Sequence, residues 1–262
     1  MVSTEAARTA VGIIGNIICL FFYLSPVPTF VRIWKKRSVE QYIAFPYLAA
    51  LINCLAWTIY GLPMVQPGSI PVLTISAAGV AVESVYVVLF FIFSDKRKRL
   101  KVLLILLVGL SFNALLGCLV LTLVHTHKKR SKIVGIICAS FSVLMNFSPL
   151  AVMKLVITTK SVEFMPFYLS FASFVNNAAW VIYALLRFDS FVLIPNGLGL
   201  LFGLTQLILH AVYSKSTKEL MAARKGPKGK EVDLSDDVVA EEPPKKIIGI
   251  ITPENGPDSD NH

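Results

Sequence analysis

Charged residues are scarce in this chain. They make up 16% of its 262 residues, against 55% for hydrophobic residues, whereas a soluble domain of this size carries about 25% charged residues. The mean hydropathy is +0.68. This balance excludes an ordinary soluble domain and indicates a membrane protein. The formal net charge of +9 does not indicate a nucleic-acid partner, because Lys and Arg beside apolar spans are topology signals.

Cysteine pairs and catalytic motifs are also lacking. The four cysteines lie in apolar segments without a CxxC pattern, so neither a disulfide framework nor a zinc site is expected. No P-loop, nucleophile elbow, metal-ligand cluster or pair of catalytic carboxylates occurs. We therefore expect no enzymatic activity and no cofactor. The N-terminus lacks a basic n-region and a small-residue cleavage site, which predicts a retained first span rather than a signal peptide.

Long apolar segments are what the chain has instead. Each reaches about 20 residues, the length that crosses a hydrocarbon core of about 30 Å. Each must be helical, because a backbone in lipid has to satisfy its own hydrogen bonds. The expected fold is an all-α membrane protein with seven transmembrane helices at residues 10–32, 43–63, 70–93, 102–124, 133–157, 165–186 and 191–213.

The chain contains an internal duplication. Residues 134–185 match residues 11–62 at about 16 of about 52 ungapped positions, and a repeat of this kind defines the fold. The segment 102–124 has no counterpart in either copy. A unit of three transmembrane helices ends on the opposite side of the membrane from where it began, so one extra helix between two such units makes them parallel. Parallel repeats occur in transporters that have a substrate site between the repeats. The expected 3+1+3 organisation is an N-terminus at 1–9, a first repeat at 10–99, a linker helix at 100–125 and a second repeat at 132–218.

Basic residues in the connections predict the orientation. One side carries about 15 Lys and Arg against about 6 on the other, and the basic side faces the cytosol. This places the N-terminus outside and the C-terminus in the cytosol, although the basic cluster at 128–132 opposes the trend. Residues 219–262 are polar and rich in Pro and Gly, which predicts a disordered cytosolic tail. Ser235, Thr252 and Ser259 are candidate phosphorylation sites there, and a tail without a switch is an equal alternative.

Four prolines occupy related places in the two repeats. Pro26 and Pro149 lie within the first helices, whereas Pro46 and Pro166 lie early in the second. Proline removes a backbone hydrogen bond and kinks a helix, which membrane bundles tolerate. We expect hinges at these places, with static kinks as the alternative.

Aromatic and amide side chains form a second repeated set. Trp57 and Trp180 occupy equivalent positions deep within spans, and Asn53 and Asn176 lie one helical turn earlier on the same faces. Asn196 follows a proline in the last span. Aromatic rings and amides together suit a neutral polyhydroxylated ligand, because rings cover its C–H face and amides bind its hydroxyls. The alternative is that the asparagines tie helices together.

Ionisable residues are nearly absent from the spans, where Glu83 is the one clear acid. A proton- or sodium-coupled pump needs more relay residues, so the sequence favours uncoupled transport. Tyr60, Tyr183 and Asp189 lie near the outer helix ends. They are candidates for gate hydrogen bonds or for interface anchors.

Several motifs resemble those of the SWEET sugar facilitators of plants, a family built from parallel repeats. The resemblance covers residues 8–218 and is carried by SPVPTF (25–30), KRSVEQ (36–41), AFPY (44–47), TKSVEFMPF (159–167) and IPNGLG (194–199). It implies bidirectional, uncoupled sugar transport by alternating access, with hinges at the four prolines and sugar stacking on both tryptophans. It also implies a central amide pair, of which Asn196 is one member and the other position holds Ser76.

The resemblance also bears on the substrate. Family members that prefer sucrose have small residues at four pocket positions, which here are occupied by Phe22, Asn53, Met145 and Asn176. Their bulk or amide character resembles monosaccharide-type members and predicts glucose or a similar hexose, with sucrose as the alternative. The family further implies a plasma-membrane location, with vacuolar or other internal membranes open, and homo-oligomers in the lipid bilayer.

Three other functions are less consistent with the sequence. A seven-helix receptor does not explain the duplication, the short loops or the lack of an extracellular disulfide candidate. A related proton-coupled amino-acid carrier has a Pro-Gln signature, and no Pro-Gln dipeptide occurs here. A channel differs from a facilitator mainly in its kinetics, so the sequence leaves it open.

Overall fold

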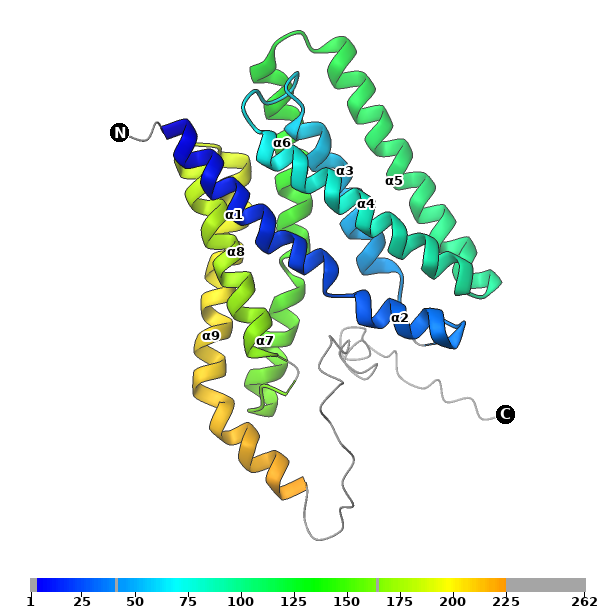
Figure 1. Ribbon diagram of the computed structural model, residues 1–262, viewed down its shortest axis with the longest axis vertical. Coiled ribbons are helices and arrows are strands. Elements are labelled where there is room, and N and C mark those ends of the chain that lie inside the picture. The colour runs from blue at the N-terminus through cyan, green and yellow to red at the C-terminus, as the bar shows by residue number, and fades with distance from the viewer. Residues whose placement is uncertain (1–3, 41, 164, 225–262) are drawn as a thin grey trace, which may run out of the picture.

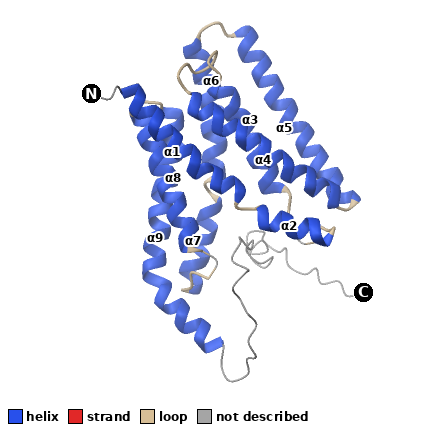
Figure 2. Ribbon diagram, viewed as in Figure 1, coloured by secondary structure: helices blue, strands red, loops and turns tan. Residues whose placement is uncertain are grey.

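The computed structural model describes residues 4–40, 42–163 and 165–224, and these form helices joined by short turns, with no strand among them (Figure 2). The predicted all-α membrane class is confirmed. The helices are α1 (Thr4–Leu24), α2 (Val27–Lys36), α3 (Phe45–Gly61), α4 (Ile70–Phe93), α5 (Lys96–Leu123), α6 (His127–Met145), α7 (Ser148–Thr159), α8 (Phe167–Leu185) and α9 (Ser190–Arg224).

The surface of the helices is that of a membrane protein. Large apolar side chains such as Phe21, Val108 and Leu123 are about 70% exposed, which soluble proteins avoid in such numbers. Five stretches are long and apolar enough to cross a bilayer, namely Thr4–Lys36, Ile70–Phe93, Lys96–Leu123, His127–Thr159 and Ser190–Ala222. The shorter apolar helix α3 has 17 residues. The chain is a multi-pass membrane protein.

Two of the four repeated prolines interrupt the first helix of each repeat. α1 ends at Leu24 and α2 begins after Pro26, while α6 ends at Met145 and Pro149 lies in the first turn of α7. Proline fits the first turn of a helix because that N–H has no partner within the helix. The stretches Thr4–Lys36 and His127–Thr159 therefore each consist of two helices with a break between them.

The other two prolines start helices and do not kink them, which corrects the expectation of four kinks. Pro46 lies in the first turn of α3, and Pro166 is the N-cap of α8 with extended backbone angles (φ −61°, ψ 131°). A proline inside a continuous helix occurs at Pro195 of α9. The sequence alone did not distinguish a proline that interrupts a helix from a proline that starts one. The difference depends on where the loop before α3 or α8 ends.

The helices form two groups with the same internal packing. α4 packs against α1, α2 and α3, and α9 packs in the same way against α6, α7 and α8. The groups meet twice, where α1 packs on α8 and α3 packs on α6. Each of these contacts joins the helix that begins one group, α1 or α6, to the third helix of the other group, α8 or α3. α5 lies at the outer edge beside α3, α4 and α6 (Figure 1).

The buried core is shared by both groups at one end only. At the end that carries the N-terminus, a single cluster joins residues of α3 and α4 to residues of α6, α8 and α9, including Tyr60, Val72, Val134, Tyr183 and Val192. At the opposite end the groups have separate clusters, one around Phe30 and Phe90 and one around Val156. The two groups are therefore packed together at the N-terminal end and apart at the other.

The last helix is longer than the sequence indicated. α9 continues to Arg224, so residues 219–224 are helical and not part of the predicted disordered tail. Apolar residues such as Leu220 and Met221 extend the helical pattern into a segment whose composition is otherwise polar. The rest of the predicted tail, with Ser235, Thr252 and Ser259, lies outside the described residues.

A glycine at the end of α3 sets how closely α3 approaches α4. A Cβ atom at Gly61 would lie 2.7 Å from the backbone nitrogen of Leu73, whereas one at Gly117 of α5 would meet only Ile59 Cδ1 at 3.6 Å. Backbone cannot move aside as a flexible side chain does. We expect Gly61→Ala to destabilise the protein by about 1–3 kcal/mol and Gly117→Ala to be neutral or slightly stabilising. Thermal unfolding of both variants in detergent tests this, and equal melting temperatures would contradict it.

Candidate functional site

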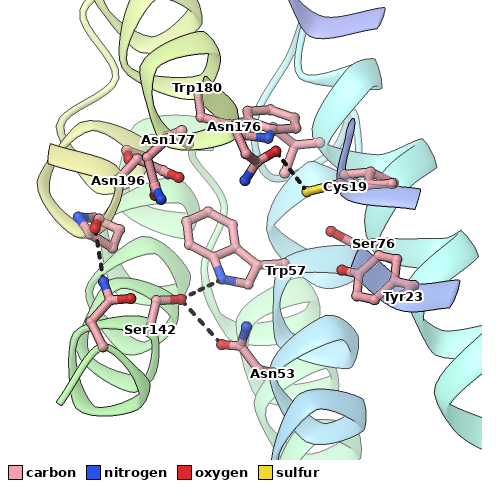
Figure 3. Close-up of a pocket in the computed structure, with 15 residues that line it drawn as sticks. Cys19, Tyr23, Asn53, Trp57, Ser76, Ser142, Asn176, Asn177, Trp180 and Asn196 are labelled. Atoms are coloured by element: carbon pink, nitrogen blue, oxygen red, sulfur yellow. Dashed lines mark hydrogen bonds between the residues drawn. The ribbon is translucent and has the colours of Figure 1, made fainter. Parts of the chain in front are cut away.

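A cavity of about 190 Å³ lies between the two groups of helices (Figure 3). α1, α3 and α4 contribute one side of it, and α6, α8 and α9 contribute the other. Its lining residues are Cys19, Tyr23, Asn53, Trp57, Val72, Ile75, Ser76, Ser142, Asn146, Asn176, Asn177, Trp180, Val192, Pro195 and Asn196. The structure thus brings six of the eight predicted binding residues together in one place.

Trp57 is held by a residue of the other repeat. Its indole Nε1 donates to Ser142 Oγ at 2.9 Å, and Ser142 Oγ donates to Asn53 Oδ1 at 3.3 Å (Figure 3). Asn53 precedes Trp57 by one helical turn, so both side chains leave the same face of α3. The hydroxyl on α6 therefore orients the ring and the amide together.

The second repeat copies this arrangement with a thiol. Cys19 of α1, which occupies the place equivalent to Ser142, donates to Asn176 Oδ1 at 3.3 Å. Asn176 again lies one turn before a tryptophan, Trp180. Each tryptophan–asparagine face therefore meets the first helix of the opposite repeat.

Most of the polar atoms in the cavity are amides, and several are oriented by main-chain oxygens. Asn196 Nδ2 donates to Val192 O at 2.8 Å, and Asn146 Nδ2 donates to Pro195 O at 2.9 Å. Asn177 Nδ2 donates to Ser173 O at 2.8 Å. These bonds hold the amides in place and leave their carbonyl oxygens to accept from hydroxyl groups. Two indole rings and several amides are suited to a neutral polyol.

Ser76 and Asn196, which the family resemblance pairs between the two repeats, both line the cavity. Ser76 is buried on α4, while Asn196 is held by its bond to α9. The shorter side chain supplies a single hydroxyl where the second repeat supplies an amide. The cavity is therefore chemically asymmetric along the line that joins these residues.

A buried tyrosine–aspartate pair joins the two repeats at the N-terminal end. Tyr60 Oη donates to both carboxylate oxygens of Asp189, at 2.8 and 2.9 Å. The backbone N–H groups of Phe191 and Val192 also donate to Asp189 Oδ1. Tyr60 is fully buried and Asp189 is 5% exposed. This bond crosses from one repeat to the other beside the cavity.

Tyr183, the equivalent tyrosine of the second repeat, has a different contact. The guanidinium of Arg8 lies over its ring, with Cζ 4.1 Å from the centroid, and Arg8 Nη1 donates to Gly68 O at 2.5 Å. Arg8 is almost fully buried, and the Tyr183 hydroxyl has no hydrogen-bond partner among the described residues. The equivalent tyrosines are thus held by a carboxylate in one case and by a cation in the other.

Two predicted binding residues lie outside the cavity. Phe22 lines a groove between α1 and α8, and Met145 lines a groove between α3 and α6. Cys19 and Tyr23 are four residues apart and share the face of α1 that meets the cavity, and Phe22 is rotated from that face by about 100°. Met145, the last residue of α6, is rotated in the same way from the face that carries Ser142 and from the C-cap residue Asn146.

Nine lining residues were not predicted, and five of these have polar side chains or a thiol, namely Cys19, Tyr23, Ser142, Asn146 and Asn177. Two pairs of them, Cys19 with Ser142 and Tyr23 with Asn146, are equivalent between repeats but differ in type. A search for identical residues passes over such pairs. A search for positions that are polar in both repeats, whatever the residue type, would have found these two pairs.

Comparison with known proteins identifies the family. The family model described as "Sugar efflux transporter for intercellular exchange" matches the chain twice, at residues 9–98 and 132–218. The chain belongs to the SWEET family. Residues 99–131 lie between the two regions that the family model matches.

Relatives with curated names agree. The chain is 53% identical over 239 residues to the bidirectional sugar transporter SWEET4 of Oryza sativa subsp. japonica, covering 91% of this chain and 92% of that protein. It is 55% identical over 223 residues to SWEET7 of Arabidopsis thaliana, covering 85% and 86% of the two chains. A solved structure of a eukaryotic SWEET transporter matches with a TM-score of 0.78 and 39% identity, covering 81% of this chain and 99% of that one. These proteins are transporters and not enzymes.

The contribution of the Tyr60–Asp189 hydrogen bonds to stability can be tested by comparing Tyr60 with Tyr183, the equivalent tyrosine of the second repeat. Tyr60→Phe removes two bonds to a buried carboxylate, and hydrogen bonds to charged groups contribute about 1.5–3 kcal/mol. Tyr183→Phe removes a hydroxyl without such a bond. We expect thermal unfolding to show a lower melting temperature for Tyr60→Phe and little change for Tyr183→Phe. Equal losses in the two variants would mean that the bond to Asp189 has no special role.

Proposed function

We propose that this SWEET protein is a bidirectional, uncoupled facilitator that moves a sugar across a membrane by alternating access. The observation that carries the proposal is the position of the cavity. Polar and aromatic residues of both repeats surround it, a buried tyrosine–aspartate bond closes it on one side, and the repeats have separate cores on the other. A site between two repeats that open at one end at a time is the arrangement of alternating access.

The proposed topology is seven spans in a 3+1+3 order. α1 with α2, α3 and α4 form the first repeat within 10–99, α5 is the linker within 100–125, and α6 with α7, α8 and α9 form the second repeat within 132–218. The two separate matches to one family model and the matching packing of α4 and α9 support this division. The basic connections support a cytosolic location for the end with separate cores, so the described conformation opens inward.

Trp57 and Trp180 are proposed to cover the C–H faces of the sugar, with Asn53, Asn176, Asn196 and Ser76 bonding its hydroxyls. The hydrogen bonds from Ser142 and Cys19 support this role, because they fix each amide beside its tryptophan. A prearranged site loses less conformational entropy on binding.

The helix breaks at Pro26 and Pro149 and the helix starts at Pro46 and Pro166 are proposed as hinges. All four lie toward the end where the repeats have separate cores, since their neighbours along the chain, such as Phe30 and Met165, belong to those separate clusters. Small changes of backbone angle at these places would bring together the ends of the two repeats that have separate cores. Tyr60, Tyr183 and Asp189 would then separate to open the outer side.

The proposal of uncoupled transport rests on the scarcity of buried charge. Among the described residues, the buried ionisable side chains are Arg8, Glu83 and Asp189, apart from tyrosines and cysteines. Arg8 and Asp189 belong to the closed outer end, and Glu83 does not line the cavity. A coupled transporter needs a titrating or ion-binding group beside its substrate.

The proposed substrate is a hexose such as glucose. The cavity of about 190 Å³ is smaller than the 300 Å³ or more typical of pockets for drug-sized ligands, and the amides of Asn53 and Asn176 occupy places where sucrose-type members have small residues. Sucrose transport is the alternative. A plasma-membrane location and homo-oligomeric assembly are proposed from the family.

Counterflow of labelled glucose in liposomes tests the function. Vesicles preloaded with unlabelled glucose should accumulate label transiently, at the same rate with and without a pH gradient. Trp180→Ala and Asn196→Ala should lower the flux at least tenfold, since each removes a substrate contact, while Trp34→Ala, whose ring is 51% exposed outside the cavity, should not. Absent trans-acceleration would support a channel, and normal flux in both cavity variants would mean that the sugar binds elsewhere.

Substrate choice can be measured in the same vesicles. We expect glucose flux to exceed sucrose flux at least tenfold, because the amides of Asn53 and Asn176 take up space that a second ring needs. Replacing both with serine should raise sucrose flux relative to glucose flux. Comparable fluxes of the two sugars in the unmodified protein would contradict the proposal of hexose preference.

A further inference from the structure

A groove between the linker helix and both repeats has the form of a lipid site. Its inner part, which we call the apolar channel, has a volume of about 520 Å³ and is lined by Phe45, Pro46, Ala49, Ile52, Asn53, Ile105, Phe141, Leu144, Met145 and Ser148. Its outer part, the basic mouth, has a volume of about 420 Å³ and is lined by Glu40, Tyr42, Ile43, Ala44, Phe45, Leu48, Phe90, Lys98, Lys101, Val102 and Ile105. Phe45 and Ile105 line both parts, so the two adjoin.

The face of α5 changes from basic to apolar along the groove. Lys101 and Val102 follow Lys98 by three and four residues, and Ile105 follows them by four and three, so all four residues share one face of the helix. The lysines lie at the start of α5, and Ile105 lies about 10 Å deeper by the rise of a helix. On α3, Phe45, Ala49 and Ile52 form a similar stripe. An ammonium pair above two apolar stripes is complementary to an anionic head group above a hydrocarbon chain.

The charges at the mouth have no acidic partner. Lys98 Nζ donates to the main-chain oxygen of Glu40 at 2.7 Å, and the carboxylate of Glu40 pairs instead with Lys36 at 2.7 Å. Among the described residues, no carboxylate forms an ion pair with Lys98 or Lys101. α3 also begins at the mouth without a side-chain cap hydrogen bond, which adds the positive end of its dipole. The mouth therefore favours an anion.

The second lateral groove lacks this chemistry. It lies between α1 and α8 and is lined by Ile18, Phe21, Phe22, Ser25, Pro166, Tyr168, Leu169, Phe171, Ala172 and Val175, with no lysine or arginine. Ala172 is the equivalent of Ala49 in the duplicated sequence. The difference arises because the linker helix α5 packs beside the first repeat and has no counterpart beside the second.

We propose that the basic mouth and the apolar channel together bind one anionic phospholipid. Its phosphate lies between Lys98 and Lys101, and one acyl chain runs between α3, α5 and α6 toward Asn53. Basic pockets between membrane helices on the cytosolic side are suited to such head groups. Asn53 also lines the central cavity, so the chain end packs directly behind a residue of the cavity. The site does not depend on which sugar, if any, is transported.

Lipid retention by the purified full-length protein tests the proposal. The protein is equilibrated with vesicles of phosphatidylcholine and phosphatidylglycerol, extracted into a neutral detergent and analysed by native mass spectrometry. We expect one retained phosphatidylglycerol. Lys98→Gln with Lys101→Gln should weaken its retention roughly thirtyfold, since each cation near the surface contributes about one factor of five.

Matched variants separate the site from general surface effects. Lys96→Gln with Arg97→Gln removes the same charge from the same turn of α5 outside the mouth and should retain the lipid. Ala49→Leu should expel it by filling the channel, while Ala172→Leu in the second groove should not. Melting temperatures in lipid-free detergent should agree among all variants, and any variant that unfolds is replaced by Lys98→Met with Lys101→Met or Ala49→Val.

Several outcomes would overturn the proposal. Equal loss in the two charge variants would mean non-specific attraction to the basic surface. Full retention in Ala49→Leu, or equal protection against unfolding by glycerol phosphate alone, would mean that only a head group binds. Retention of phosphatidylcholine as readily as phosphatidylglycerol would mean an apolar groove without charge selection.

Discussion

The hydrogen bonds between Tyr60 and Asp189 join the two repeats at the end that carries the N-terminus. A buried carboxylate is costly unless it is paired and hydrogen-bonded, and here a tyrosine of the other repeat together with two backbone N–H groups meets that need. Tyr60 also belongs to the apolar cluster that both repeats share. At the opposite end the repeats have separate cores, and the cavity lies between the two groups of helices.

The two repeats are alike in packing and unlike in chemistry. Ser142 and Cys19 hold equivalent asparagines, whereas a carboxylate holds Tyr60 and a cation holds Tyr183. The first repeat also carries α5 at its side, which creates a basic mouth that the second groove lacks. Duplication therefore supplies the shared frame, and divergence within it makes the cavity and the lateral grooves chemically asymmetric.

Much of the site could be predicted because the duplication marks it. Trp57 with Trp180 and Asn53 with Asn176 are identical pairs within spans, and identical residues at equivalent depths indicate a shared cavity. Cys19, Tyr23, Ser142, Asn146 and Asn177 escaped notice because they differ between repeats or lack a motif. Phe22 and Met145 were predicted from the family resemblance, and one residue of helical rotation separates the cavity from the lateral grooves.

The sequence by itself determined the membrane class, the duplication, the helical content and the family, since these follow from composition, periodicity and motifs along the chain. Only the tertiary structure decided which end is closed, which helix faces meet and where helices start around Pro46 and Pro166. It also decided how far α9 extends beyond the apolar span. These features depend on contacts between residues far apart in the chain, such as Trp57 with Ser142, and a local pattern contains no information about the partner that a side chain will meet.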